Sequence, residues 1–191
     1  MDFDAVVLAG GRSRRLGGID KRQLQVGGRS LLQLACEAVG AATDIVAVGP
    51  GDLPTPAGVR WVHEQPPGGG PAAALGAALD ALARSSRQLV LVLACDVPRS
   101  GEALPSLLAA ASAGGADGWV AVDEDGRRQT LLAVYTRRTL HRRLQALAPL
   151  DGTALRVVLD GLDLAEVQVP PAATRDIDTW DDAQELGARR P

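Results

Sequence analysis

An uninterrupted apolar run, Leu89 to Ala94, is the feature that most limits what this chain can fold into. A strand with apolar side chains on both faces must be covered on both, which is typical of the centre of a parallel sheet with helices on either side. Asp96 follows the run almost directly. We therefore expect an α/β protein with Asp96 at the carboxyl edge of its sheet.

Strand-like and helix-like segments alternate along the rest of the chain. The expected strands cover residues 5–9, 45–48, 59–63, 119–122, 131–135 and 166–169. The expected helices cover residues 30–39, 71–84, 101–113, 137–147, 153–159 and 180–188. This alternation predicts a three-layer α/β/α sandwich with a mostly parallel sheet. Because no repeat or long linker divides it, residues 1–191 are expected to form a single domain.

Positive charge is concentrated near the N-terminus of a chain whose formal net charge is −3. The mildly acidic balance argues against general nucleic-acid binding, which requires a basic surface. Basic residues nevertheless gather in one short stretch: Arg12, Arg14, Arg15, Lys21 and Arg22. This local cluster needs a specific explanation.

The two cysteines, Cys36 and Cys95, lie far apart within apolar stretches and have no CxxC spacing. Buried free thiols are therefore expected rather than a disulfide or a metal site. The N-terminus lacks a basic signal region, and no apolar run approaches the roughly 18 residues that span a bilayer. We expect a cytoplasmic protein that does not enter the membrane.

The segment from Leu8 to Lys21 carries the strongest functional signal. The first expected strand delivers Gly10 and Gly11 to the edge at which open α/β sheets bind ligands. Glycines here let backbone N–H groups approach a base or phosphate closely. Arg15 and Lys21 supply charge that can neutralise a triphosphate. A glycine turn beside a solvated basic surface is the structural alternative, but it does not account for all of these features together.

Two better-known phosphate-binding motifs fail on spacing. A Walker A loop requires GxxxxGK[ST], whereas Lys21 follows Asp20 and precedes Arg22. A dinucleotide-binding turn requires GxGxxG directly before a helix, which the stretch from Gly10 to Arg15 does not supply. P-loop NTPases and nicotinamide-dependent dehydrogenases are therefore not favoured.

Asp96 is the first candidate for holding a metal ion. Magnesium prefers hard oxygen ligands and commonly uses one or two carboxylates together with substrate phosphates. The structural alternative is that Asp96 caps a following helix. Pro98 and Gly101 make an immediate helix start unfavourable, so the metal role is preferred.

The stretch from Leu8 to Lys21 resembles the LAGGxSxRxGxDK motif of molybdenum cofactor guanylyltransferases, which are nucleotidyltransferases with a Rossmann-like α/β/α fold. The resemblance covers essentially the whole chain and implies a loop that wraps the GTP base and phosphates. The phosphates would then contact Arg15 and Lys21. The nucleotide contacts that the resemblance implies in the first part of the motif are Leu8, Ala9, Gly10 and Gly11.

Two acidic motifs extend the resemblance. Cys95-Asp96-Val97-Pro98 matches the family's CDxP motif, whose aspartate binds magnesium. Residues 176–182 resemble its C-terminal motif, NxNTPEDL or DxDTPEDL. The alternate aspartates Asp176 and Asp178 fall on one face, and Asp178 is the candidate for a second magnesium ligand and a substrate contact. Capping of the last helix by Thr179 or Asp181 is the structural alternative.

The choice of nucleotide depends on small departures from the family pattern. The cytidylyl branch usually reads LAAG where this chain reads LAGG, and glycine at position 10 leaves room for a purine, which favours GTP. Asp178 stands where guanylyltransferases commonly have Asn and the cytidylyl branch often has Asp, which favours CTP. The balance of these features is in favour of GTP.

The segment from His63 to Leu75 corresponds to the family's D…GPLAG segment, which shapes the base and acceptor pocket. Glu64 replaces the usual aspartate and is a candidate nucleotide contact, with a plain surface loop as the alternative. Gly69, Gly70 and Pro71 are candidate substrate contacts, because they lead into a helix whose N-terminus can bind an anion.

A basic turn at Arg127, Arg128 and Gln129 resembles a segment that precedes an acceptor-side strand in the family. Its side chains either touch the pterin phosphate or only form a hairpin turn, and the turn is preferred. Proline is usual in the family where Thr130 stands.

Together these features predict a magnesium-dependent enzyme that moves GMP from GTP to the terminal phosphate of molybdenum-molybdopterin and releases pyrophosphate. Arg15, Lys21 and Asp96 are its expected catalytic residues, and a molybdoenzyme or its chaperone is its expected protein partner. Two alternatives stay open: a cytidylyltransferase acting on the same cofactor, and a non-catalytic accessory protein that delivers nucleotide or cofactor to a molybdoenzyme.

Overall fold

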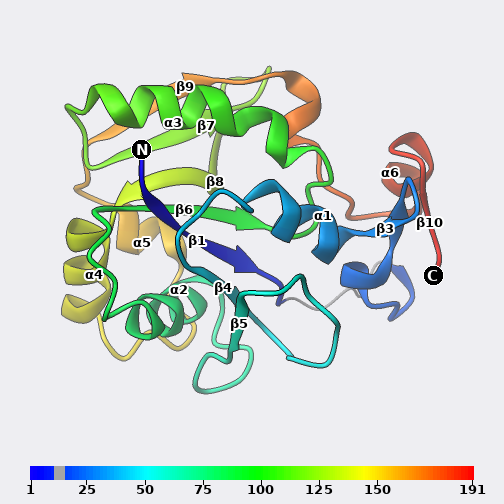
Figure 1. Cartoon of the computed structure of the whole chain (residues 1–191), viewed down its shortest axis with the longest axis horizontal. Coiled ribbons are helices and arrows are strands. Elements are labelled where there is room, and N and C mark those ends of the chain that lie inside the picture. Colours follow the sequence, from blue (N-terminus) through cyan, green and yellow to red (C-terminus); the bar gives the residue numbers. More distant parts are fainter. Residues whose placement is uncertain (11–15) are drawn as a thin grey trace.

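The computed structural model describes residues 1–10 and 16–191 and contains a seven-stranded sheet in the order β5-β4-β1-β6-β8-β7-β9 (Figure 1). Neighbouring strands run parallel, except that β8 is antiparallel to both β6 and β7. The strands are β1 (Phe3–Leu8), β4 (Ile45–Val48), β5 (Val59–Val62), β6 (Leu89–Ala94), β7 (Gly118–Val122), β8 (Arg128–Thr136) and β9 (Leu164–Gln168). The predicted mostly parallel sheet is confirmed.

Strand β6 occupies the central position that its sequence predicts. It pairs with β1 on one side and β8 on the other. Its four middle residues, Val90 to Leu93, have no solvent exposure. An all-apolar strand is stable here because helices cover both faces of the sheet.

Helices lie on both faces of this sheet and complete the three predicted layers (Figure 1). On one face, α1 (Leu31–Ala38) and α3 (Leu104–Ala113) pack on one apolar core. On the other face, α2 (Pro71–Ala81), α4 (Arg137–Ala146) and α5 (Leu155–Leu159) pack on a second. The side chains of β1 alternate between the two cores, as the period of a strand requires.

A small antiparallel sheet, ordered β10-β2-β3, stands beside the main one at the right of Figure 1. Its strands are β2 (Gln25–Val26), β3 (Arg29–Ser30) and β10 (Ala188–Arg189). With helix α6 (Trp180–Glu185) it surrounds a third apolar cluster, made of Leu16, Leu24, Leu31, Ile177 and Ala183. This cluster joins the segment after β1 to the C-terminal segment of the chain.

The last helix is shorter than predicted. It was expected to continue to Ala188, but α6 ends at Glu185 and Ala188 pairs with Val26 in the small sheet. Gly187 has a φ of 69°, a left-handed conformation that favours glycine and terminates helices. At the other boundaries the differences are small: the 3-10 helix η3 (Ser100–Ala103) precedes α3, and β8 begins earlier than expected.

Cys36 and Cys95 are buried free thiols, as predicted. Burial raises the pKa of Cys36 to about 11 and also raises the pKa of Cys95. Both side chains therefore stay protonated at neutral pH and act as small apolar groups in the core.

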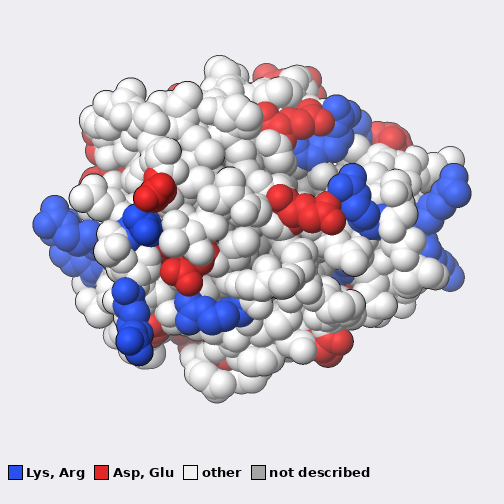
Figure 2. Space-filling model, viewed as in Figure 1, with Lys and Arg blue, Asp and Glu red and all other residues white. Residues whose placement is uncertain are grey.

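Basic and acidic side chains are interspersed in small groups on the face shown in Figure 2. Positive charge on this face is therefore not gathered into one broad surface. Among the residues that the structure describes, no helix combines the length and the apolar character needed to traverse a bilayer.

Candidate active site

The site begins where β1 and β6 leave the sheet side by side. Leu8 pairs with Ala94 at the last position of this parallel ladder, and the Cys95 N–H donates to the Leu8 carbonyl at 3.0 Å. Gly10 and Asp96 therefore emerge at the same carboxyl edge. This is the juxtaposition that the sequence predicts from two strands each followed by a functional residue.

Lys21 returns to this edge and contacts both acidic motifs. Its Nζ lies 3.2 Å from Asp96 Oδ2 and also forms an ion pair with Asp178 Oδ1. The Lys21 side chain is only 17% exposed. Burial by itself would lower the pKa of Lys21, but the Asp178 hydrogen bond and the charges of Asp96 and Asp178 outweigh it and raise the pKa. Lys21 is therefore a fixed positive charge at the sheet edge.

A short 3-10 helix, η2 (Lys21–Gln23), sets the direction of the Lys21 side chain. Asp20 caps it by accepting from the Arg22 N–H at 3.0 Å. Leu24, directly after the helix, is fully buried in the third apolar cluster. The backbone that carries Lys21 is therefore held at both ends.

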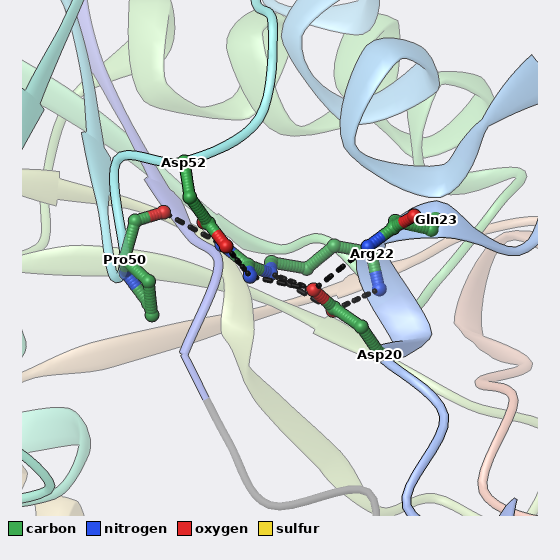
Figure 3. A network of polar contacts seen from close by, with 5 residues as sticks. All are labelled: Asp20, Arg22, Gln23, Pro50 and Asp52. Carbon is green, nitrogen blue, oxygen red and sulfur yellow. Dashed lines mark hydrogen bonds and ion pairs between the residues drawn. The ribbon is translucent and has the colours of Figure 1, made fainter.

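The sequence places Arg22 in a cluster of basic residues, but its side chain is not a solvated cation. Its side chain is 9% exposed and forms ion pairs with Asp20 and Asp52. Figure 3 shows the guanidinium between Asp20 on one side and Asp52 and Pro50 on the other. The charge of Arg22 is thus neutralised within the protein. The other arginines of the cluster, Arg12, Arg14 and Arg15, lie outside the described residues, as does Gly11.

Three carboxylates meet at the site: Asp96, Asp176 and Asp178. One ligand oxygen from each lies within 4.8 Å of the others. Between the last two, Ile177 is buried in the third apolar cluster, and its N–H donates to the Asp96 carbonyl at 3.0 Å. Alternation along this extended segment therefore turns Asp176 and Asp178 toward Asp96 while Ile177 points into the core.

The sequence predicts Asp178, but not Asp176, as a metal ligand. The sequence does contain a signal for Asp176, because the alternation of the segment places it on the same face as Asp178. The structure adds that negative charge is crowded at Asp176: partial burial and the charges of Asp178 and Asp96 raise its pKa. The crowding marks Asp176 as part of the same group of carboxylates.

This donor set fits a divalent cation. Magnesium takes oxygen ligands at about 2.1 Å in octahedral geometry, so ligands on opposite sides of the ion lie roughly 4 Å apart. Carboxylate oxygens within 4.8 Å of one another reach that arrangement with small side-chain movements. Hard oxygen donors without sulfur or imidazole favour a hard cation.

The capping alternatives are resolved differently for the two acidic motifs. The helical segment after Asp96 starts only at Ser100, with Arg99 as its N-cap residue, so Asp96 is not a cap. At α6 the expectation of a cap is correct for Thr179, which forms a capping box with Asp182. The Asp178 side chain is therefore not the helix cap, and it contacts Lys21 instead.

The residues that are expected to contact the nucleotide at the end of β1 differ in their solvent exposure. Leu8 and Ala9 are buried, and the Ala9 N–H donates to the Val48 carbonyl at 2.8 Å. Gly10 is exposed, has no left-handed φ, and a Cβ built on it would meet nothing within 4 Å. Neither the backbone nor the packing of the described residues therefore requires a glycine at position 10.

The segment around Glu64 has a local structural explanation. Glu64 Oε1 accepts from the Gly68 N–H at 3.0 Å, which organises the loop before α2. Gly69 is buried, and a Cβ there would lie 3.0 Å from the Ala73 Cβ. Gly70 has a φ of 92° and precedes Pro71 at the first turn of α2. Substrate contacts by these residues stay a prediction.

A cavity of about 590 Å³ opens beside Asp96. Asp96 and Asp176 line one part of it, and the β7–β8 hairpin around residues 123–129 lines another. The preferred hairpin turn is confirmed, because Asp123 Oδ1 accepts from the Arg127 N–H at 2.8 Å. Arg127, Arg128 and Gln129 nevertheless line the cavity as well. The space is therefore next to the carboxylates and bordered by both acidic and basic side chains.

A sequence profile of the MobA-like NTP transferase domain matches residues 5–167. A "Probable molybdenum cofactor guanylyltransferase" of Mycobacterium avium is 31% identical over 176 residues, which cover 89% of this chain and 87% of that protein. A protein of Chloroflexus aggregans with the same description is 32% identical, and the match covers 90% of this chain and 86% of that protein.

The fold is also similar to a crystal structure of molybdopterin-guanine dinucleotide biosynthesis protein A from Archaeoglobus fulgidus. The TM-score is 0.73 at 20% identity, and 96% of each chain is covered. At this identity the similarity concerns the fold.

Proposed function

The chain belongs to the family of MobA-like NTP transferase domains, and from this premise we propose that it transfers GMP from GTP to the terminal phosphate of molybdenum-molybdopterin and releases pyrophosphate. The relatives from Mycobacterium avium and Chloroflexus aggregans carry the description of that activity and match about nine-tenths of this chain. The product would be the guanine dinucleotide form of the cofactor, for use by a molybdoenzyme.

The observation that carries the proposal is the contact of Lys21 with Asp96 and Asp178. It brings the end of the glycine-rich loop, the end of the central strand and the C-terminal acidic motif to one edge of the sheet. A triphosphate needs cations on one side and a carboxylate-held metal on the other. This edge offers Lys21 as a cation and three carboxylates that could hold a metal.

The reaction would be an in-line displacement in which an oxygen of the acceptor's terminal phosphate attacks the α-phosphorus of GTP. The bond from that phosphorus to the bridging oxygen breaks, and the electron pair leaves with pyrophosphate. Lys21 would stabilise the charge that builds on the leaving group, and Arg15 would share this role. No protein nucleophile is required, so positioning and charge neutralisation supply the rate enhancement.

Asp96, Asp176 and Asp178 would hold magnesium, which when bound would offset negative charge on the nucleotide and acceptor phosphates. Lys21 contacts two of these carboxylates, so its ammonium group balances part of their negative charge. The cavity beside Asp96 would receive the acceptor. Arg127 and Arg128 at its border pair with Asp125 and Glu166, and they would exchange these partners to bind an anionic group.

The preference for GTP over CTP rests on Gly10. Because packing among the described residues does not require glycine there, the space that a side chain at position 10 would fill would be available to a base. A purine needs more of that space than a pyrimidine.

The test is a nucleotide panel. The protein is incubated with magnesium, the molybdenum cofactor and each of GTP, CTP, ATP and UTP, and released pyrophosphate and dinucleotide product are measured. Product with GTP alone supports the proposal, whereas product with CTP identifies a cytidylyltransferase. Binding of nucleotide or cofactor without pyrophosphate release would identify an accessory protein and overturn the proposal.

A further inference from the structure

Arg22 is nearly buried and joins two segments that are separate in sequence. Its NH1 donates to Asp52 Oδ1 at 2.9 Å and to the Pro50 carbonyl at 2.6 Å. Its Nε donates to Asp20 Oδ1 at 2.9 Å, and its NH2 to Asp20 Oδ2 at 2.5 Å. The planar guanidinium fork suits two carboxylates at once, which a lysine does not (Figure 3).

The connection that Arg22 reaches lies against the start of the glycine-rich loop. Gly49, directly after β4, has a φ of 145°, and a Cβ on it would lie 2.6 Å from the Ala9 carbonyl oxygen. The Ala9 N–H donates a hydrogen bond to the Val48 carbonyl. Residues 49–52 therefore pass tightly beside the exit of β1, where the loop begins.

Arg22 thus closes a ring. The loop leaves β1 at Ala9 beside Gly49 and ends at Asp20, and Arg22 ties that end to Asp52 of the same connection. Asp20 is thus held to the connection after β4, and Lys21, which directly follows Asp20, takes a defined position. The Lys21 side chain extends from there to Asp96 and Asp178.

We infer that Arg22 is a positioning residue, which latches the end of the glycine-rich loop to residues 50–52 and thereby holds Lys21 at the carboxylates. The latch carries charge throughout the neutral range. Although burial acts to raise the pKa of Asp20, the Arg22 guanidinium outweighs it and lowers the pKa. The inference rests on the proposed function only for the role of Lys21 in turnover.

The first test reads the position of Lys21 without using activity. Lys21 is the only lysine in the chain, so acylation by an amine reagent, followed by peptide mass spectrometry, reports this side chain separately from the N-terminal amine. Arg22→Gln should increase its rate of acylation about tenfold, since local opening exposes the amine. Asp52→Asn removes one partner of the latch and should give a smaller increase.

Arg137→Gln is the matched control. Arg137 also donates three hydrogen bonds, to the carbonyls of Leu82, Ser85 and Arg87, but it lies at the opposite edge of the sheet. It should lower Tm and leave acylation of Lys21 unchanged. If Arg22→Gln does not fold, Asp52→Asn takes its place. Acylation at the wild-type rate in the folded latch variants would overturn the inference.

The second test is a double-mutant cycle in pyrophosphate release. Arg22→Gln should lower kcat/KM for the nucleotide by about 10- to 100-fold in the wild-type background, a typical effect of a misplaced catalytic group. In the Lys21→Ala background the same change should have less than about a threefold effect, because the side chain that Arg22 positions has already been removed. Equal factors in both backgrounds would show that Arg22 acts on the substrate directly or only on folding.

The two tests separate the two proposals. A wild-type protein that releases no pyrophosphate with any nucleotide would refute the proposed function, while acylation would still decide the latch. Active wild-type protein with additive effects would refute the latch alone.

Discussion

Lys21 Nζ lies 3.2 Å from Asp96 Oδ2, although 75 positions separate the two residues in the sequence. The contact joins the residue after the glycine-rich loop to the residue after the central strand. It also places a fixed positive charge at this edge, because ion pairing with the carboxylates outweighs burial and keeps Lys21 protonated.

Lys21→Ala should lower turnover by about 10²–10³, as the loss of other preorganised electrostatic groups does. The lost charge would act mainly in the transition state, so kcat should fall more than KM rises. Steady-state pyrophosphate release measures both constants. Turnover within threefold of wild type would contradict a catalytic role for Lys21.

Asp176→Asn should weaken binding of Mn²⁺, used as a paramagnetic substitute for magnesium, by about tenfold or more. Loss of a carboxylate removes both a ligand and a charge from the set that contains Asp96 and Asp178. Electron paramagnetic resonance titration gives the affinity. Asp181→Asn, an exposed change in the following helix, is the control and should leave affinity unchanged. Equal affinities for both variants would remove Asp176 from the metal site.

Gly10→Ala and Gly49→Ala should separate substrate space from protein space. A methyl group on Gly10 meets nothing within 4 Å, so Tm should stay constant while KM for GTP rises. A methyl on Gly49 would lie 2.6 Å from the Ala9 carbonyl oxygen at a φ of 145°, so this variant should lose stability. Thermal unfolding and GTP kinetics on both variants provide the measurement. A KM for GTP unaffected by Gly10→Ala would argue against a base at this position.

Asp4→Asn should stabilise the protein at neutral pH. Asp4 is fully buried in β1, where the nearby Ser85 and the charge of Arg137 only partly offset the cost of burying its carboxylate. Burial raises the pKa of Asp4 above its unfolded value, so the folded state binds more protons and loses stability as pH rises through this range. A gain of about 1 kcal/mol would raise Tm by about 2–4 °C in a chain of this size.

The pH dependence provides the control for Asp4. The difference in Tm between Asp4→Asn and wild type should be largest near pH 7 and should vanish as the pH falls toward the unfolded pKa of about 4. A difference that is constant with pH would show that the charge of Asp4 is not the cause.

The sequence by itself determined the sheet and its functional edge. Hydrophobic runs such as Leu89 to Ala94 specify buried strands through local patterning, and a residue that directly follows a strand must lie at the strand's end. Gly10 and Asp96 could therefore be placed at one edge, and Thr179 could be recognised as a cap, because these are relations between close neighbours in the chain.

Only the tertiary structure decided how charges are paired at that edge. The sequence counted Arg22 with the basic cluster, but packing turned it toward Asp52 and left Lys21 to face Asp96 and Asp178. Asp176 lies with Asp96 and Asp178 for a similar reason, since burial of Ile177 fixes the orientation of the segment that carries it. Which of several nearby charges meet depends on contacts between segments far apart in the chain, and no local period encodes those contacts.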